Sequence, residues 1–205
     1  MVDHNGLSAS QLQNQQKLFN AAEQLFERFG YKKTTVIDIC KAAGMSKPTF
    51  YGLFKDKGEL FVALLFEVFG REIKDWKNTQ PTNAEPLSCL LAFIEFYENV
   101  LVKKPIFRLI VEDPTVMEKF AWVLHHTANS PVLTTLRQIL KDGINAGQFR
   151  TLDPDAVLWM IYALLDSMYI LMPMMTGEPG AGENPDIARE VKSFILSGVG
   201  VNNEE

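Results

Sequence analysis

The segment that decides the fold begins at Thr35, ends at Lys57 and reads TVIDICKAAGMSKPTFYGLFKDK. It predicts two short helices joined by a tight turn. Thr35 and Asp38 have the spacing of a capping box that opens the first helix, and Gly44 supplies the left-handed residue that ends it. Ser46 is placed to cap the second helix. Two helices at this spacing form a helix-turn-helix, whose second helix enters the major groove of DNA.

The same segment resembles the DNA-binding headpiece of the tetracycline-repressor (TetR) family of bacterial transcription regulators. That family's pattern is Thr, Ile-Ala, Ala-Gly-Val-Ser, then Tyr, Phe and a Lys that opens the next helix. The matching residues here are Thr35, Ile39, Cys40, Ala43, Gly44, Met45, Ser46, Tyr51, Phe54 and Lys57. Two positions depart from the pattern. Cys40 replaces the usual Ala, and Gly52 stands where the family often has a larger residue, which removes one possible DNA contact.

The resemblance implies an all-α protein with a three-helix headpiece and a larger helical bundle that binds a ligand and forms a dimer. We expect the headpiece and its linking helix to span residues 11–76, and the ligand-binding and dimerisation domain to span 77–199. The loop at 78–86, with two prolines, favours a boundary there.

The helix-turn-helix pattern and the family positions together predict a set of DNA contacts. The expected residues are Thr35, Lys47, Pro48, Thr49, Phe50, Tyr51 and Lys57. Lys57 and Thr35 would meet phosphate at helix starts, and Lys47 and Thr49 would lie near base edges or phosphates. Phe50 could touch a thymine methyl group or pack inward as core. Tyr51 could hold phosphate or be a core ring with its hydroxyl at the surface.

The charge distribution supports contact with nucleic acid at one end. The whole chain has a formal net charge of −5. Within residues 28–57, however, the anions are only Asp38 and Asp56, and the cations are Arg28, Lys32, Lys33, Lys41, Lys47, Lys55 and Lys57. A basic face on an acidic body is typical of such proteins. The alternative is a solvated lysine face.

Apolar residues recur at helical spacing almost throughout the chain, without sustained alternation of period two. The segment from 156 to 175 is long and apolar enough to span a membrane. Asp166 lies at its centre and acidic residues flank it, so a buried helix in a bundle is favoured. This helix, starting at Asp153, and a last helix from Asp186 are the expected dimer bundle, because the first is apolar nearly all round.

Aromatic residues are dense in the C-terminal half and suggest a cleft for a small apolar or aromatic ligand. The candidates are Phe93, Phe96, Tyr97, Phe107, Phe120, Trp122, Trp159, Tyr162, Asp166 and Tyr169. The alternative for each ring is ordinary core packing. Asp166 needs a partner inside an apolar helix, which could be a cationic ligand, a group across the dimer, or Arg108 or Arg137.

The sequence gives little support for a disulfide, a metal site or a catalytic site. Cys40 and Cys89 lie in apolar helical patterns and suggest buried thiols in a reducing cytoplasm. His125 and His126 are adjacent, so on a helix they point about 100° apart and ligate one ion poorly. We find no catalytic constellation and expect no metal and no cofactor. The sequence therefore predicts a cytoplasmic, homodimeric regulator of a pseudo-palindromic DNA operator, most simply a repressor released by a small molecule. An activator with the same headpiece and, more distantly, a helical enzyme are the alternatives.

Overall fold

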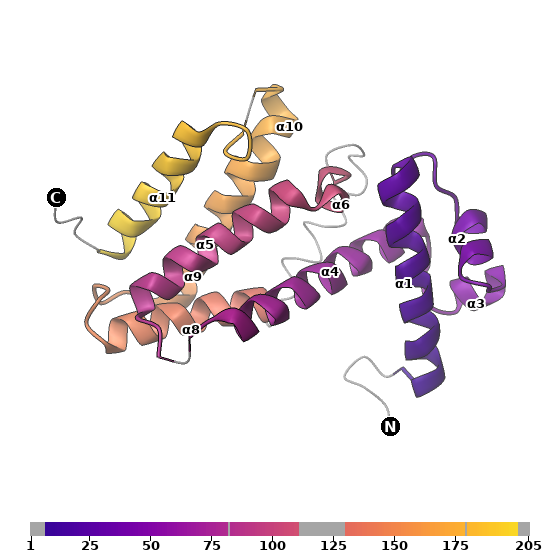
Figure 1. The fold of residues 1–205 in the computed structure, drawn as a ribbon, viewed down its shortest axis with the longest axis horizontal. Helices are drawn as coiled ribbons and strands as arrows, with labels where there is room; N and C mark the ends of the chain where they lie inside the picture. Colours follow the sequence, from indigo (N-terminus) through magenta and orange to yellow (C-terminus); the bar gives the residue numbers. More distant parts are fainter. Residues whose placement is uncertain (1–6, 82, 111–129, 179, 201–205) are drawn as a thin grey trace. The chain divides into compact units, whose positions relative to one another are not determined.

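The computed structural model describes residues 7–81, 83–110, 130–178 and 180–200. Every regular element within these ranges is a helix (Figure 1), which confirms the predicted all-α fold. The described residues form two compact units. The first holds residues 7–68 and 105–110, and the second holds the remainder. Their division lies inside helix α4 (Lys57–Thr79), between Val68 and Phe69, and therefore before the loop at which we expected the domains to separate.

The first unit is the headpiece. It consists of α1 (Ala9–Phe29), α2 (Val36–Ala42), α3 (Lys47–Tyr51), the first half of α4, and α6 (Pro105–Arg108). Helix α1 packs against α2 and α6, and α2 packs against α3. The side chains that fill its core are fully buried and include Leu18, Ala22, Phe26, Ile39, Phe50, Leu60, Phe61, Leu64 and Leu65.

The expected helix-turn-helix is present between α2 and α3. The Thr35 hydroxyl accepts from the Asp38 N–H at 3.2 Å, and the Asp38 carboxylate accepts from the Thr35 N–H at 3.0 Å, which completes the capping box. Gly44 has φ +65°, a conformation that favours glycine. Met45 N–H then reaches back to the Cys40 carbonyl at 2.8 Å, closing a Schellman motif that ends α2.

The second unit contains the rest of α4, then α5 (Pro86–Lys103), α8 (Pro131–Asn145), α9 (Pro154–Asp166) and α11 (Pro185–Val199). Helix α8 packs against both α5 and α9, and α9 also contacts α11. The helix expected at 116–127 lies outside the described residues. Helix α6 ends at Arg108, short of the predicted end at Glu112, with Leu109 and Ile110 in a turn.

The long apolar helix expected from Asp153 to about Met172 is interrupted. After α9 the chain forms a π-helix, η1 (Ser167–Leu171), and then α10 (Met172–Thr176). In η1 the hydrogen bonds skip five residues instead of four, so that Met172 N–H donates to the Ser167 carbonyl. Asp166 is therefore the last residue of regular α-helix before a change of helical pitch.

Candidate functional site

Helix α3 presents the predicted recognition residues on a very short scaffold. It holds five residues, fewer than the two turns expected from the sequence. The Ser46 hydroxyl caps it by accepting from the Thr49 N–H at 3.3 Å, and it also lies 2.9 Å from the Thr49 hydroxyl. Lys47 and Pro48 are exposed, and Thr49 is half-buried. The cap therefore fixes the helix while Lys47 and Pro48 remain open to solvent.

The two adjacent aromatic residues of α3 point in opposite directions. Phe50 is 0% exposed, and its ring centroid lies 5.9 Å from that of Phe54 in the headpiece core. The prediction that Phe50 touches DNA is therefore wrong, because a ring with no exposed area has nothing to offer a base; its alternative, core packing, holds. Tyr51 is 56% exposed, with its ring edge-on to Phe50 at 5.3 Å. The buried Phe50 ring thus packs against the exposed Tyr51 ring.

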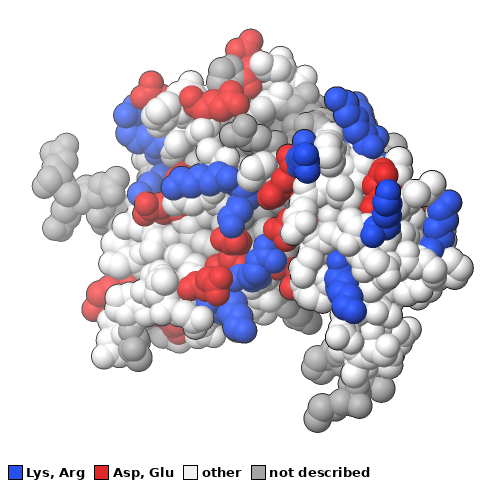
Figure 2. Space-filling view, turned by 45° about the vertical axis from the view of Figure 1, so that its right-hand side comes forward, with Lys and Arg blue, Asp and Glu red and all other residues white. Residues whose placement is uncertain are grey.

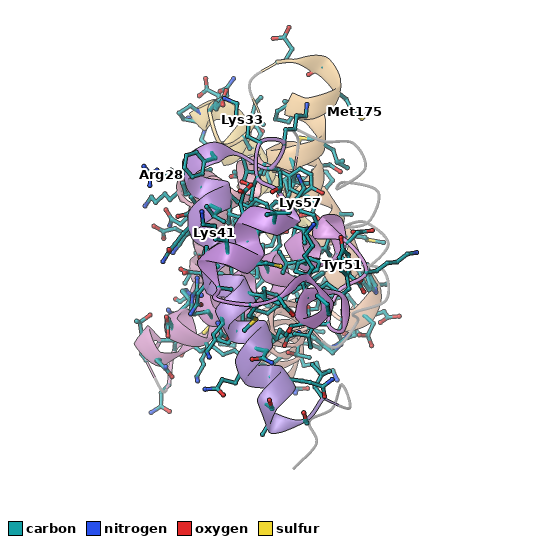
Figure 3. All side chains as sticks on the ribbon, turned by 90° about the vertical axis from the view of Figure 1, so that its right-hand side faces the viewer. Arg28, Lys33, Lys41, Tyr51, Lys57 and Met175 are labelled. Carbon is teal, nitrogen blue, oxygen red and sulfur yellow. The ribbon has the colours of Figure 1, made fainter. Side chains whose placement is uncertain are left out.

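Exposed cations surround these residues. Figure 2 shows Lys and Arg side chains predominating over Asp and Glu on the headpiece part of the face in view. In Figure 3, which looks onto the headpiece, Arg28, Lys33 and Lys41 lie to the left of Tyr51. The Thr35 hydroxyl and backbone N–H groups hold the pKa of the Asp38 carboxyl below its usual value, so this anion remains charged and committed to the helix cap. The headpiece therefore carries the basic surface expected from the sequence.

Lys57 lies at the start of α4, and its ammonium contacts the protein itself. Its Nζ donates to the Tyr31 carbonyl at 2.6 Å and to the Thr34 carbonyl at 2.9 Å. It also lies 4.0 Å from the centroid of the Tyr31 ring. Both carbonyls belong to the turn between α1 and α2. The sequence predicted a phosphate contact here and did not foresee these partners.

The second unit encloses the predicted carboxylate among tyrosines. The hydroxyls of Tyr97, on α5, and of Tyr162, on α9, both hydrogen-bond to the Asp166 carboxylate. Burial raises the pKa of Asp166 to about 6, and the two phenol donors limit the rise because they favour the charged form. Burial and the neighbouring carboxylate raise the pKa of both tyrosines.

These contacts correct the expected partner of Asp166. Arg137 pairs instead with Asp155, at 2.5 Å from Nε to Oδ1. The side chain of Arg108 lies outside the described residues, and its backbone belongs to the headpiece unit. Since the carboxylate already accepts hydrogen bonds from within its own unit, it does not require a cationic ligand.

The structure brings together only some of the predicted ligand residues. Phe93, Phe96 and Tyr97 pack along α5, and the Trp159 ring centroid lies 6.2 Å from that of Tyr162. The Tyr169 hydroxyl donates to the Glu98 carboxylate, which together with burial raises the tyrosine's pKa. Phe107 is buried and belongs to the headpiece unit. Phe120 and Trp122 lie outside the described residues.

Two aromatic members of this cluster were missed by sequence reasoning. The Trp76 ring lies 5.3 Å from Phe96, and the Phe69 ring lies 5.5 Å from Tyr97. Both come from the second half of α4. Their helical spacing was visible in the sequence, but nothing in it indicated that this half of α4 packs on α5. The aromatic cluster is therefore built from three helices, α4, α5 and α9.

In the described parts of the chain, no group of three or more His, Cys, Asp or Glu side chains could hold a metal ion; His125 and His126 lie outside them. The segment Pro154–Leu171 is long and apolar enough to cross a membrane, with a mean hydropathy of 1.3. Only 28% of it is buried, and Asp155 and Asp166 lie within it. Length and composition alone are weak evidence for a span.

A helix-turn-helix on a basic, capped headpiece, followed by a helical bundle, defines a DNA-binding transcriptional regulator. Residues 18–64 match the model of the bacterial regulatory proteins of the tetR family. A Bacillus subtilis (strain 168) protein described as an HTH-type transcriptional regulator, YhgD, is 28% identical over 155 residues, which are 72% of this chain and 78% of that protein. The DNA-binding headpiece of this chain is therefore similar to that of the tetR-family regulators.

Solved structures agree on the fold. The regulator FadR from Bacillus subtilis, in complex with stearoyl-CoA, has a TM-score of 0.63 and 21% identity, covering 90% of this chain and 98% of that one. RolR in complex with resorcinol has a TM-score of 0.68 and 18% identity, covering 94% and 90%. The two-part helical fold is therefore shared across nearly the whole chain.

Proposed function

We propose that this regulator is a cytoplasmic repressor that binds a pseudo-palindromic operator as a homodimer. The observation that carries the proposal is the short α3, which displays Lys47, Pro48 and Tyr51 while Phe50 anchors it to the core. With Thr35 and Thr49, these residues form the proposed DNA-contacting surface. A helix of five residues makes few base contacts, so useful specificity requires two headpieces.

The second unit offers a surface suited to pairing two copies. Met160 on α9 is 67% exposed and Phe194 on α11 is 71% exposed. These helices contact each other within one chain. Large apolar side chains exposed on adjacent helices are costly in water and favour burial against a partner. We therefore place the two-fold interface on α9 and α11. Binding to successive major grooves requires the two copies of α3 to lie about 34–36 Å apart on DNA.

The effector of this regulator is proposed to be a small apolar or aromatic molecule. The aromatic cluster of α4, α5 and α9 supports this class, as do the stearoyl-CoA and resorcinol bound by structurally similar proteins. The effector releases DNA only if it binds the DNA-incompetent form more tightly, and operator DNA must then weaken effector binding by the same factor.

Selection from random double-stranded DNA tests the proposal. Purified full-length protein should enrich inverted half-sites spaced by one helical turn. A reporter gene placed under the control of the selected operator should be expressed less when the regulator is present. Tyr51→Phe, which keeps the ring that packs on Phe50 and removes one exposed hydroxyl, should enrich the same half-sites with lower affinity. Enrichment of a single asymmetric half-site bound by a monomer contradicts the dimeric reading, and activation of the reporter contradicts repression.

A further inference from the structure

Lys57 holds a turn that determines where the helix-turn-helix begins. The turn runs from Tyr31 to Thr34 and joins α1 to α2. Both ends of it accept a hydrogen bond from the same ammonium group, at 2.6 Å for the Tyr31 carbonyl and 2.9 Å for the Thr34 carbonyl. Thr35, the next residue, caps α2. Whatever fixes Thr34 therefore fixes the first residue of the DNA-binding motif.

The side chains of Tyr31 and Thr34 also fix the turn through contacts of their own. The Tyr31 ring is buried and lies 5.6 Å from Phe26 and 5.0 Å from Phe61. The Thr34 hydroxyl, also buried, donates to the Gly30 carbonyl at 2.8 Å. Lys57 adds the link to α4, since its partners lie 26 and 23 residues earlier in the chain. The ammonium group thus links the start of α4 to the turn between α1 and α2.

We propose that Lys57 is a positioning residue for operator recognition, which sets the turn from Tyr31 to Thr34 and with it the orientation of α2 and α3. This inference rests on the proposed DNA-contacting surface. It replaces the expected phosphate contact of Lys57, because two of the three N–H donors of the ammonium are directed at backbone carbonyls and the group lies over an aromatic ring.

The positioning role predicts a particular pattern of loss. Lys57→Met should weaken binding to the selected operator by about tenfold, comparable to the loss of one good base contact. Binding to a scrambled duplex, and the slope of log K against log salt, should stay as in wild type, because no phosphate contact is lost. Lys57→Arg should restore operator preference, since a guanidinium can donate to both carbonyls and stack on the ring.

A matched control removes the same charge from the DNA-contacting surface. Lys47→Met, on the exposed side of α3, should lower the salt slope by about 1 per protomer. Affinities are measured by titration at several salt concentrations, well below the melting temperature of each full-length variant. If Lys57→Met does not fold, Lys57→Gln, which keeps an N–H donor without the charge, is measured in its place.

Two results overturn the inference. If Lys57→Met weakens both duplexes alike and lowers the salt slope as Lys47→Met does, Lys57 is a phosphate contact. If it melts earlier yet binds the operator as wild type does, its role is stability alone. Wild-type protein that binds operator and scrambled duplex equally contradicts the proposed function itself, whereas a wild-type preference that Lys57→Met leaves unchanged contradicts only the role of Lys57.

Discussion

Each of the two units places one charged side chain among aromatic rings, and the two are satisfied differently. In the headpiece the Lys57 ammonium bonds backbone carbonyls. In the second unit the Asp166 carboxylate bonds the hydroxyls of Tyr97 and Tyr162. Carbonyls of a turn move only if the backbone moves, whereas hydroxyls rotate. The comparison indicates that Lys57 fixes the backbone conformation of the headpiece turn. The hydrogen bonds to Asp166 in the second unit can instead adjust by rotation of the tyrosine hydroxyl groups.

The largest expected effect tests whether the two cores are separate. Phe61, in the headpiece, and Phe93, in the second unit, are both fully buried. Replacing either by Ala should lower the free energy of unfolding by about 3–5 kcal/mol, from lost burial and a cavity. In a Trp122→Phe background, in which tryptophan fluorescence reports Trp76 and Trp159 alone, we expect Phe61→Ala to abolish operator binding at a lower urea concentration than the fluorescence change. Phe93→Ala should shift the fluorescence transition itself. Equal displacement of both signals by both variants would show one cooperative unit.

The next effect is a pH dependence of stability that comes from Asp166. Burial raises its pKa from the usual 3.8 of an aspartate to about 6, so the folded state binds the proton more tightly. Stability from this group is present below pH 3.8 and is lost as pH rises to about 6, at most 3 kcal/mol in total.

Asp166→Asn isolates this contribution. The variant keeps an oxygen that accepts from Tyr97 and has no proton to lose. The difference in unfolding free energy between variant and wild type, from urea titrations between pH 4.5 and 7.5, should therefore grow in the variant's favour as pH rises. A difference that stays flat across this range would mean that Asp166 titrates as an exposed carboxyl does.

The smallest effect tests whether Tyr51 on α3 contacts DNA or serves only in core packing. Tyr51→Phe removes an exposed hydroxyl and keeps the ring against Phe50. One hydrogen bond to a charged group such as phosphate contributes about 1.5–3 kcal/mol, so operator affinity should fall by about tenfold or more per protomer. The urea midpoint should not move. A loss of stability without loss of affinity would assign Tyr51 to the core.

Local features of the headpiece could be read from the sequence, and long-range ones could not. The Thr35–Asp38 capping box and the Gly44 turn depend on residues within a few positions of each other, and both are present as predicted. The direction of Phe50 was left open because α3 is too short for periodicity to define a face. The partners of Lys57 lie more than 20 residues away and are backbone atoms, for which side-chain identity gives no signal.

The aromatic site was harder to predict for the same reason. Tyr97 and Asp166 are 69 residues apart, and only the packing of α5 against the segment after α9 brings them together. The density of aromatic residues marked Phe107 as strongly as Phe93, although Phe107 belongs to the headpiece unit. An apolar stripe predicts that a helix face is buried, but it does not identify the helix that packs against that face. The residues that form the aromatic cluster could therefore be identified only from the structure.

The π-helix after Asp166 has a consequence for aligning this chain with its relatives. A π-turn accommodates one more residue than the α-helical turn it replaces. A relative whose helix continues in the α form needs a one-residue gap within 167–171. Without that gap, every later position of α10 is matched to a neighbour that points about 100° away on the helix. Substitution patterns after Leu171 are therefore informative only once this extra residue has been placed.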